Sequence, residues 1–445
     1  MRSALSLLVT AIAWGLVGTS AGAHEPAHAK RAALTILISL DGFRSEYLDR
    51  GETPTLQSLA KEGVRSSMEP AFPSLTFPNH TTLLTGLYPD HHGVVANTFE
   101  DATLGKSWRL NNRESATDPD LWRVAAPLWA TAVAQGVRSG AIFWPIVGVD
   151  KAGKAPALLQ PLDAKAPAAS ELATLFSWLD QPETRRPRLI FLYFGRVDGV
   201  GHQFGPVSPQ MDAVLAETDA AIGQLMDGLR SRRLAQSTNI IVVADHGMTG
   251  ISKDRLVELD TIVPLSQVRI VTMGALAGVA PRPGFETAVD EALLGRHGHM
   301  QCWLKNEVPA QFHYGANPRV PPIVCLADLG WEIVTKGAAP FWPGSYRGDH
   351  GFDPREPDMA AMFVAHGPAF RRGVVWPRFP SVDVYALTAA VAGVRAEPSD
   401  GRLSDVAGMT TSLVRPPRQA ITGTSQAPRG QDRLGQVSPR GDRQS

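Results

Sequence analysis

Three aspartates, Asp41, Asp198 and Asp245, each end a short apolar run of the sequence, and histidines lie close to two of them. His246 directly follows Asp245, and His202 lies four residues after Asp198. Mixed histidine and carboxylate ligands favour Zn²⁺, whereas Mg²⁺ and Ca²⁺ prefer shells made of oxygen alone. If the fold gathers these residues, we expect them to form a hydrolytic metal centre.

The spacing of Asp198 and His202 adds geometry to this expectation. Residues four positions apart lie on the same side of a helical turn, so both side chains can reach one ion. His350, in the loop Gly348–Gly351, is a further candidate ligand with a weak signal of its own. Taken alone, Asp41 is better explained as a turn residue than as a ligand. The joint occurrence of these residues at strand ends is what favours the metal centre.

Thr76 is the candidate nucleophile, in the hydroxyl-rich stretch Pro73–His80. A threonine hydroxyl is a weak nucleophile until it is activated, for example by metal coordination. We expect Thr76 at the start of a helix, where backbone N–H groups and the helix dipole favour an alkoxide or a bound phosphate. The alternative is that Thr76 only caps this helix, and the two roles are geometrically compatible.

The elements that would position these residues follow from the apolar pattern. Continuous apolar runs favour buried parallel strands, and Met211–Leu229 repeats apolar residues at helical spacing. The sequence therefore predicts an α/β fold with a central, mostly parallel sheet flanked by helices, whose ligands bind beyond the carboxyl ends of the strands. The other predicted elements include strands at Leu34–Leu40, Ala141–Trp144 and Ala360–Ala365, and helices from Thr53-Pro54 to Gly63, at Pro78–Gly86 and at Val382–Val394.

The predicted catalytic domain covers residues 24–400, with a smaller α+β insert at about 261–346, where turns with proline become frequent. Residues 1–23 have the positive residue, apolar stretch and A-x-A site of a secretory signal peptide, and a single membrane anchor is the alternative. No later stretch is long and apolar enough for a stable membrane span. We expect residues 401–445 to be a largely disordered tail, because apolar periodicity fades there.

The two cysteines, Cys302 and Cys325, fit an exported protein. In an oxidising compartment two lone cysteines tend to pair, and two thiols too far apart to bridge are the alternative. We therefore expect a periplasmic or extracellular protein. Because 43 basic and 43 acidic side chains give a formal net charge of +0, a nucleic-acid polymer is not expected as the main partner.

Several longer motifs extend these observations. They are Asp41–Arg44, Pro73–His80, Thr85–Pro89, His92–Asn97, Asp198–Pro206, Asp245–Met248, His350–Phe352, Pro357–Met359 and Ala365–Pro368. With these motifs, in the family's order, the chain resembles the nucleotide pyrophosphatase/phosphodiesterase family, within the alkaline phosphatase superfamily, over roughly Leu34 to Asp400.

The resemblance implies an alkaline phosphatase-like fold and two zinc ions per chain. It assigns Asp198, His202 and His350 to one ion, and Asp41, Asp245 and His246 to the other. Two ions about 4 Å apart can stabilise the attacking and leaving oxygens of an in-line displacement. Thr76 would contact the second ion and form a covalent phosphothreonine-type intermediate, which water then hydrolyses. Asn97 would donate to a phosphoryl oxygen, and an ordinary turn asparagine is the alternative.

Several aromatic and histidine residues in or near these motifs are candidates for binding substrate or for structural hydrogen bonds. Phe77 and Tyr193 match positions where such enzymes stack a nucleobase, and a place in the core is the alternative for each. Trp144 is a weaker pocket candidate. The remaining motif histidines are expected to form structural hydrogen bonds rather than to bind metal, and they are His80, His92 and His366.

Arg196 departs from the family, whose members usually carry acidic residues just before this metal-binding aspartate. Its guanidinium could bring positive charge near the phosphate and favour monoesters, because monoesters carry more negative charge than diesters. The alternative is a surface arginine that faces away from the site.

The resemblance thus implies hydrolysis of nucleotide pyrophosphate or phosphodiester bonds to give nucleoside 5′-monophosphates. An alkaline phosphatase-like phosphomonoesterase is one alternative, and a choline-type phosphodiesterase, which would need an aromatic or acidic cage, is another. A sulfatase is not expected, because neither cysteine begins a C-x-P-x-R stretch. A binding protein with an inactive metal scaffold is the non-enzymatic alternative, and the complete set of candidate ligands and nucleophile argues against it.

Overall fold

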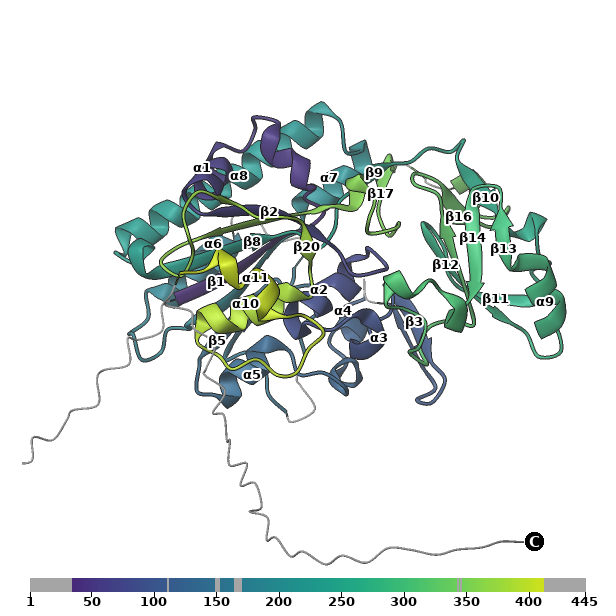
Figure 1. Ribbon diagram of the computed structural model, residues 1–445, viewed down its shortest axis with the longest axis horizontal. Helices are drawn as coiled ribbons and strands as arrows, with labels where there is room; N and C mark the ends of the chain where they lie inside the picture. Colours follow the sequence, from purple (N-terminus) through teal and green to yellow (C-terminus); the bar gives the residue numbers. More distant parts are fainter. Residues whose placement is uncertain are drawn as a thin grey trace, which may run out of the picture.

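The computed structural model describes residues 34–109, 112–148, 153–163, 170–341, 344 and 346–411 (Figure 1). Over these residues the largest element is a nine-stranded sheet. Its strands run in the order β19 (Val374–Val375), β2 (Val64–Glu69), β18 (Ala361–His366), β8 (Thr238–Val243), β1 (Leu34–Leu40), β7 (Leu189–Phe194), β5 (Ser139–Ile142) and β6 (Leu158–Gln160), with β20 (Phe379–Pro380) beside β2.

The centre of this sheet is parallel, as the apolar runs predict. Strand β1 pairs in parallel with both β7 and β8, and β5 pairs in parallel with β7 and β6. Strand β18 runs antiparallel to its neighbours β8 and β2. Ser39 of β1 lies level with Tyr193 of β7 and Val243 of β8, so the three strands end at one edge. The residues that follow them therefore emerge close together.

Helices cover both faces of the sheet (Figure 1). Helices α1 (Pro54–Glu62) and α8 (Pro209–Ser231) lie together on one face. On the opposite face lie α2 (Thr76–Thr85), α5 (Leu128–Ala134) and α10 (Asp383–Ala392). The predicted apolar stripe of α8 is buried. The stripe forms one side of the helix because the apolar residues recur at helical spacing. The predicted α/β fold, a mostly parallel sheet flanked by helices, is confirmed.

A second, antiparallel sheet lies beside the main one, at the right of Figure 1, and has a hydrophobic cluster of its own. Its five strands run in the order β11 (Val268–Thr272), β12 (Leu276–Pro281), β15 (Ile323–Ala327), β14 (Met300–Leu304) and β13 (Gly295–His297), with α9 (Glu286–Leu293) nearby. All of these elements fall within the expected insert. Cys302 and Cys325 face each other across β14 and β15 and form the predicted disulfide.

Besides several short 3-10 helices, the described part of the chain holds five further α-helices and six further strands. They are α3 (Pro89–His92), α4 (Arg113–Ala116), α6 (Ser170–Leu179), α7 (Arg196–Phe204) and α11 (Leu403–Val406), the hairpin β3 (Thr98–Asp101) and β4 (Lys106–Arg109), and the pairs β9 (Thr249–Gly250) with β17 (Gly348–Asp349) and β10 (Leu256–Glu258) with β16 (Glu332–Val334).

Three predicted boundaries need correction. Strand β5 ends at Ile142, and Trp144 lies beyond it, with its ring edge-on to His80 and Phe191 in the core rather than in an open pocket. Helix α2 starts at Thr76 rather than after it. The fold also continues past Asp400, because Val406 and Met409 are fully buried. The few apolar residues in so short a segment are not enough to establish a period, so the sequence pattern missed them.

Two predictions fall on other parts of the chain. Residues 1–23, the expected signal peptide, and most of the expected tail lie outside the described residues. Among the helices of the described part, none combines the length and the apolar character that a membrane crossing requires.

Candidate metal centre

The carboxyl edge of the main sheet carries the predicted ligands. Asp41 directly follows β1, and its backbone N–H donates to the carbonyl of Phe194 at the end of β7, 3.0 Å away. Asp245 and His246 come two and three residues after β8. Helix α7 begins two residues after β7 and holds Asp198 in its first turn. Parallel pairing of three adjacent strands is therefore what brings these aspartates together.

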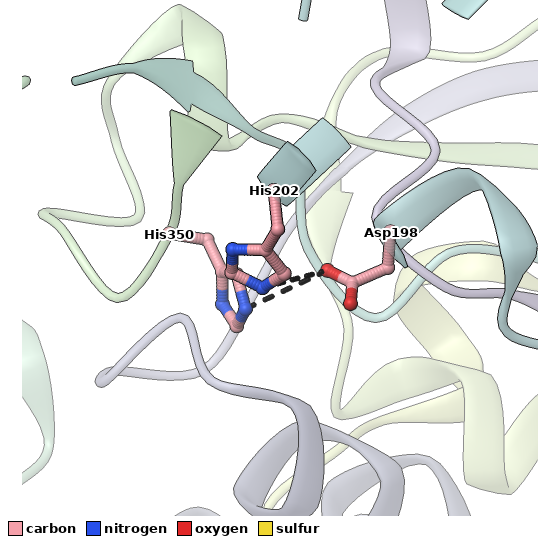
Figure 2. Close-up of side chains that lie close together, drawn as sticks. All are labelled: Asp198, His202 and His350. Carbon is pink, nitrogen blue, oxygen red and sulfur yellow. Dashed lines mark ion pairs between the residues drawn. The ribbon is translucent and has the colours of Figure 1, made fainter. Parts of the chain in front are cut away.

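Asp198, His202 and His350, which we call the outer group, converge as predicted (Figure 2). Asp198 and His202 lie one turn apart on α7, and His350 directly follows β17. Oδ1 of Asp198 is 3.4 Å from Nε2 of His202 and 3.6 Å from Nε2 of His350. Three ligand atoms thus face one small space, as one metal ion requires.

Asp41, Asp245 and His246, which we call the inner group, also converge. Nε2 of His246 lies 3.0 Å from Oδ2 of Asp245 and 3.4 Å from Oδ1 of Asp41. Oγ1 of Thr76 lies 3.2 Å from the same nitrogen, so the candidate nucleophile sits against this group. The two groups adjoin, because Asp198 also clusters with Asp41 and His246.

Gly42 allows this close approach. Its φ of +68° lies in the left-handed region, and a Cβ there would be only 3.0 Å from the Cα of Asp198. A side chain at this position would therefore both strain the backbone and push the two groups apart. The backbone N–H of Gly42 also donates to Oδ1 of Asp245 over 3.2 Å, which orients an inner carboxylate.

Three carboxylate oxygens in the site have no hydrogen-bond partner among the described residues, although they are buried. They are Oδ1 of Asp41, Oδ1 of Asp198 and Oδ2 of Asp245. A buried, unsatisfied carboxylate oxygen is costly unless a cation satisfies it. Burial, and then the negative charges of Asp245 and Asp198, raise the pKa of Asp41 well above its usual value. Bound divalent cations would relieve this repulsion, so the residues fit a metal centre.

The histidines are oriented for metal binding by their other ring nitrogen. Nδ1 lies 2.9 Å from the carbonyl oxygen of Gly348 in His202, 2.8 Å from that of Ser74 in His350 and 2.8 Å from that of Gly247 in His246. Because a carbonyl can only accept, each Nδ1 carries the hydrogen, and in a neutral ring Nε2 presents its lone pair to the site. Outer-shell carbonyls fix metal-binding histidines in this way.

The electrostatics of the histidines agree with a site that needs a cation. Burial lowers the pKa of His350 well below its usual value, and the nearby His246 and His202 add to that effect, so its ring stays neutral and able to coordinate. His246 behaves differently. Burial opposes its charging, but the carboxylates of Asp245 and Asp198 and the carbonyl of Gly247 together outweigh burial and raise its pKa. Nε2 of His246 and Oδ2 of Asp245 are 3.0 Å apart and need a cation between them. That cation can be a proton or a metal ion.

The start of helix α2 presents Thr76 to this centre. The Asn79 side chain anchors the preceding turn, because it exchanges hydrogen bonds with the backbone of Ala71 and donates to the carbonyls of Pro73 and Leu75. Oδ1 of Asn97 accepts from the backbone N–H of Phe77 over 3.2 Å. The amide of Asn97 therefore lies beside the first turn of α2, where the resemblance places a donor to a phosphoryl oxygen.

Tyr193 has a role that the sequence did not indicate. Its hydroxyl donates to Oδ2 of Asp41 over 2.6 Å, and its ring lies edge-on to His80. This hydrogen bond orients an inner carboxylate, and it occupies the tyrosine in a way that base stacking does not need. Phe77, in contrast, is only partly buried against the core. Tyr193 lies near the end of the buried strand β7, shortly before the segment that carries Asp198. This position is the only feature of the sequence that could have indicated the role.

Arg196 faces away from the metal centre. Its guanidinium pairs with Glu217 of α8 at 2.7 Å, and its side chain is 56% exposed. The alternative in which Arg196 places a positive charge beside the phosphate therefore has no support in the geometry.

One more contact joins residues of the sequence motifs. Reasoning from the residues alone did not predict it. The guanidinium of Arg44 donates to Oδ1 of Asp358 over 2.7 Å and to the carbonyl of Met248 over 3.1 Å. Thr249 donates to the other oxygen of Asp358 over 2.6 Å. These bonds tie together the segments that follow β1 and β8. Their only sequence signal is their place in the matching motifs.

Comparisons with known proteins agree with this geometry. A model of the family described as type I phosphodiesterase / nucleotide pyrophosphatase matches residues 35–353. An uncharacterized pyrophosphatase/phosphodiesterase of Schizosaccharomyces pombe is 35% identical over 82% of this chain and 78% of its own length. A bovine bis(5′-adenosyl)-triphosphatase is 34% identical over 90% of this chain and 85% of its own.

Solved structures show the same relationship. The murine ectonucleotide pyrophosphatase / phosphodiesterase 5, as an inactive threonine-to-alanine variant in complex with AMP, superposes with a TM-score of 0.80 at 33% identity, over 85% of this chain and all of that chain. The human protein of the same name gives a TM-score of 0.81 at 32% identity, with the same coverage. The chain is therefore an enzyme of alkaline phosphatase-like fold that belongs to the type I phosphodiesterase / nucleotide pyrophosphatase family.

Proposed function

We propose that this protein is an exported two-zinc hydrolase that cleaves nucleotide pyrophosphate or phosphodiester bonds and releases nucleoside 5′-monophosphates. The observation that carries the proposal is the set of three buried carboxylate oxygens without hydrogen-bond partners among the described residues. These oxygens lie between histidine nitrogens that present lone pairs. Oγ1 of Thr76 is 3.2 Å from one of these nitrogens, Nε2 of His246. Mixed nitrogen and oxygen ligands of this kind suit Zn²⁺.

In this proposal the outer and inner groups each hold one ion. When bound, zinc would supply Lewis-acid stabilisation of the attacking and leaving oxygens. The protein residues supply position and charge. Tyr193 holds the carboxylate of Asp41 through its hydroxyl, and Gly42 holds that of Asp245 through its backbone N–H. These contacts fix the ligands before substrate arrives, so that little reorganisation is needed during the reaction.

Thr76 is proposed as the nucleophile. The proton of its Oγ1 passes to solvent water, and the oxygen attacks the phosphorus of the nucleotide. The bond from phosphorus to the leaving oxygen breaks, and that oxygen departs with the electron pair of the bond. The nucleoside monophosphoryl group is then held on Thr76 until water cleaves the new bond and restores the hydroxyl. Placement in the first turn of α2 supports this role, because the helix N-terminus favours negative charge. The inactive threonine-to-alanine variant of the murine relative supports it too.

The diester preference rests on what surrounds the nucleophile. Asn97 lies beside the first turn of α2 as a neutral donor for a phosphoryl oxygen, and Phe77 is partly buried next to it. Arg196, the one residue that favoured a monoesterase, is paired with Glu217 instead. The two relatives with nucleotide-related descriptions, the bis(5′-adenosyl)-triphosphatase and the AMP complex, support a nucleotide substrate. No specific observation favours a choline-type substrate.

Export is proposed on two grounds. The first is the signal-like composition of residues 1–23, and the second is the Cys302–Cys325 disulfide, which fits an oxidising compartment.

The test is a comparison of substrates on the metal-loaded protein. We expect kcat/KM for a nucleotide diester to exceed that for p-nitrophenyl phosphate, and ATP to yield AMP and pyrophosphate. Phe77→Ala should weaken nucleotide substrates more than p-nitrophenyl methyl phosphate, by roughly 1–3 kcal/mol per stacked base. If the monoester is preferred and ATP loses its terminal phosphate first, the phosphomonoesterase replaces the proposed function.

A further inference from the structure

The buried imidazole of His80 lies behind the inner group and contacts the backbone of the nucleophile. Its Nδ1 is 2.8 Å from the carbonyl oxygen of Thr76 and 3.3 Å from Oδ2 of Asp245. We propose that His80 is a positioning residue that fixes Thr76 relative to Asp245. This inference rests on the proposed function, in which Thr76 attacks and Asp245 binds metal.

The hydrogen bonds of His80 determine its tautomer. The carbonyl of Thr76 can only accept, so Nδ1 must carry the hydrogen. Nε2 lies 2.9 Å from Oγ of Ser39, and in the neutral ring it can only accept, so the serine hydroxyl donates. A directional chain thus runs from Ser39 on β1, through the ring, to the first turn of α2. It joins the strand that delivers Asp41 to the helix that delivers Thr76.

These bonds also exclude His80 from the metal ligands. Its ring nitrogens lie close enough to Asp41 and Asp245 to complete a ligand set by distance alone. Both are already committed, one as a donor to Thr76 and the other as an acceptor from Ser39. Neither lone pair is left for an ion. The N–H at Nδ1 instead presents its partial positive charge to Asp245, whose Oδ2 lies 3.3 Å away.

The surroundings keep the ring from moving. His80 is fully buried, and the rings of Trp144 and Tyr193 meet it edge-on at centroid distances of 5.2 and 5.4 Å. Tyr193 in turn donates to Asp41. A ring locked by packing and by two hydrogen bonds can set the place of a backbone carbonyl to within the tolerance that catalysis needs, since a 1 Å displacement can cost about 10²-fold in rate.

His92 offers a matched control in the same region of the fold. It is also fully buried, its Nε2 lies 3.1 Å from Oγ1 of Thr82, and its Nδ1 accepts from the backbone N–H of Val94. Its hydrogen bonds to Thr82 and Val94 reach neither the inner nor the outer group and do not involve Thr76. Replacing it should therefore lower stability without changing the position of the nucleophile.

The experiment compares His80→Asn with His80→Gln. The asparagine amide can occupy the place of Nδ1 and still donate to Thr76, whereas the glutamine amide reaches the place of Nε2 and Ser39. We measure kcat and KM on p-nitrophenyl methyl phosphate, the melting temperature, and the affinity for the second zinc equivalent by competition with a chelator. His92→Gln is the control.

We expect His80→Gln to lower kcat by about 10²-fold with KM little changed, as for a displaced nucleophile, and to weaken the second zinc equivalent. His80→Asn should keep most of both, although it removes more of the ring and melts at the lower temperature. His92→Gln should melt lower with kcat unchanged.

The inference is overturned if kcat follows the melting temperature across all three variants, or if His80→Gln behaves like wild type. The proposed function fails separately, because the wild-type protein would then prefer p-nitrophenyl phosphate to p-nitrophenyl methyl phosphate.

Discussion

The inner and outer groups use the same kinds of ligand but stand on different parts of the fold. In the inner group the side chains of Asp41, Asp245 and His246 are 2%, 0% and 0% exposed, and all follow strands of the main sheet. In the outer group Asp198 and His202 are 17% and 18% exposed and lie on the short helix α7, whereas His350 is 4% exposed and directly follows β17. Burial and attachment thus differ although the chemistry is shared.

The difference indicates a division of labour. The inner group is held by Tyr193, Gly42 and the ends of β1 and β8, and it adjoins Thr76. The outer group is reached from solvent and depends on β17 and on the packing of α7 against α8. We therefore expect the inner ion to be the more firmly bound and more closely linked to the nucleophile, and the outer ion to exchange first.

The largest expected effect is that of Thr76→Ala, which removes the nucleophile from the inner group. The rate should fall by several orders of magnitude while both metal equivalents stay bound, because the hydroxyl is not needed to hold the fold. Thr76→Ser should keep substantial activity. Steady-state kinetics and metal analysis of the same samples check this, and normal turnover by the alanine variant would show that water attacks directly.

The comparison between the groups is broken most sharply by one substitution in each. Asp245→Asn should lose the inner ion and almost all activity, whereas His202→Gln should lose the outer ion and leave the inner ion bound. Metal content after dialysis against a weak chelator distinguishes the two. Wild-type protein should lose one equivalent faster than the other. Loss of both equivalents at one rate, or loss of the inner ion from His202→Gln, would contradict the division of labour.

The disulfide lies outside both the inner and the outer group. Its removal should therefore change stability without changing metal binding in either group. Cys302 and Cys325 are 23 residues apart and join two strands of the second sheet. On the loop-entropy model the bond contributes about 3 kcal/mol to the free energy of unfolding. Replacing both cysteines with alanine should lower the melting temperature and leave kcat of the folded enzyme unchanged. A fall in metal content at a temperature where the variant is folded would link this sheet to the centre.

Arg196→Ala should have the smallest effect. Its partner is Glu217, and a pair of exposed side chains contributes about 0–1 kcal/mol to stability. The ratio of kcat/KM for p-nitrophenyl methyl phosphate to that for p-nitrophenyl phosphate should therefore stay as in wild type. A change in this ratio would mean that the arginine leaves Glu217 when substrate binds and acts on the phosphate.

The sequence predicted much of the centre because its signals are local. Asp41 and Asp245 follow strands whose apolar runs are continuous, and Asp198 with His202 shares one helical turn. His350 directly follows β17, which pairs with β9, and lies more than a hundred residues after the other predicted ligands. The sequence around it therefore indicated little. The motif resemblance is what made His350 a predicted ligand.

What the sequence did not reveal are the contacts between distant segments. Tyr193 is aromatic, so the sequence indicated base stacking. Only the register of β7 against β1 reveals that its hydroxyl lies beside Asp41. The direction of Arg196 likewise depends on where α8 packs against α7. Side-chain directions of this kind are set by tertiary packing, which a linear pattern does not contain.

The central claim is that the two groups hold two ions, and counting them tests it most directly. The protein purified without chelator and supplied with zinc should contain two zinc ions per chain by elemental analysis, and activity should be lost as the ions are removed and return with them. An anomalous diffraction map should place one ion in each group. One ion or none per chain, with full activity retained in chelator, would contradict the account.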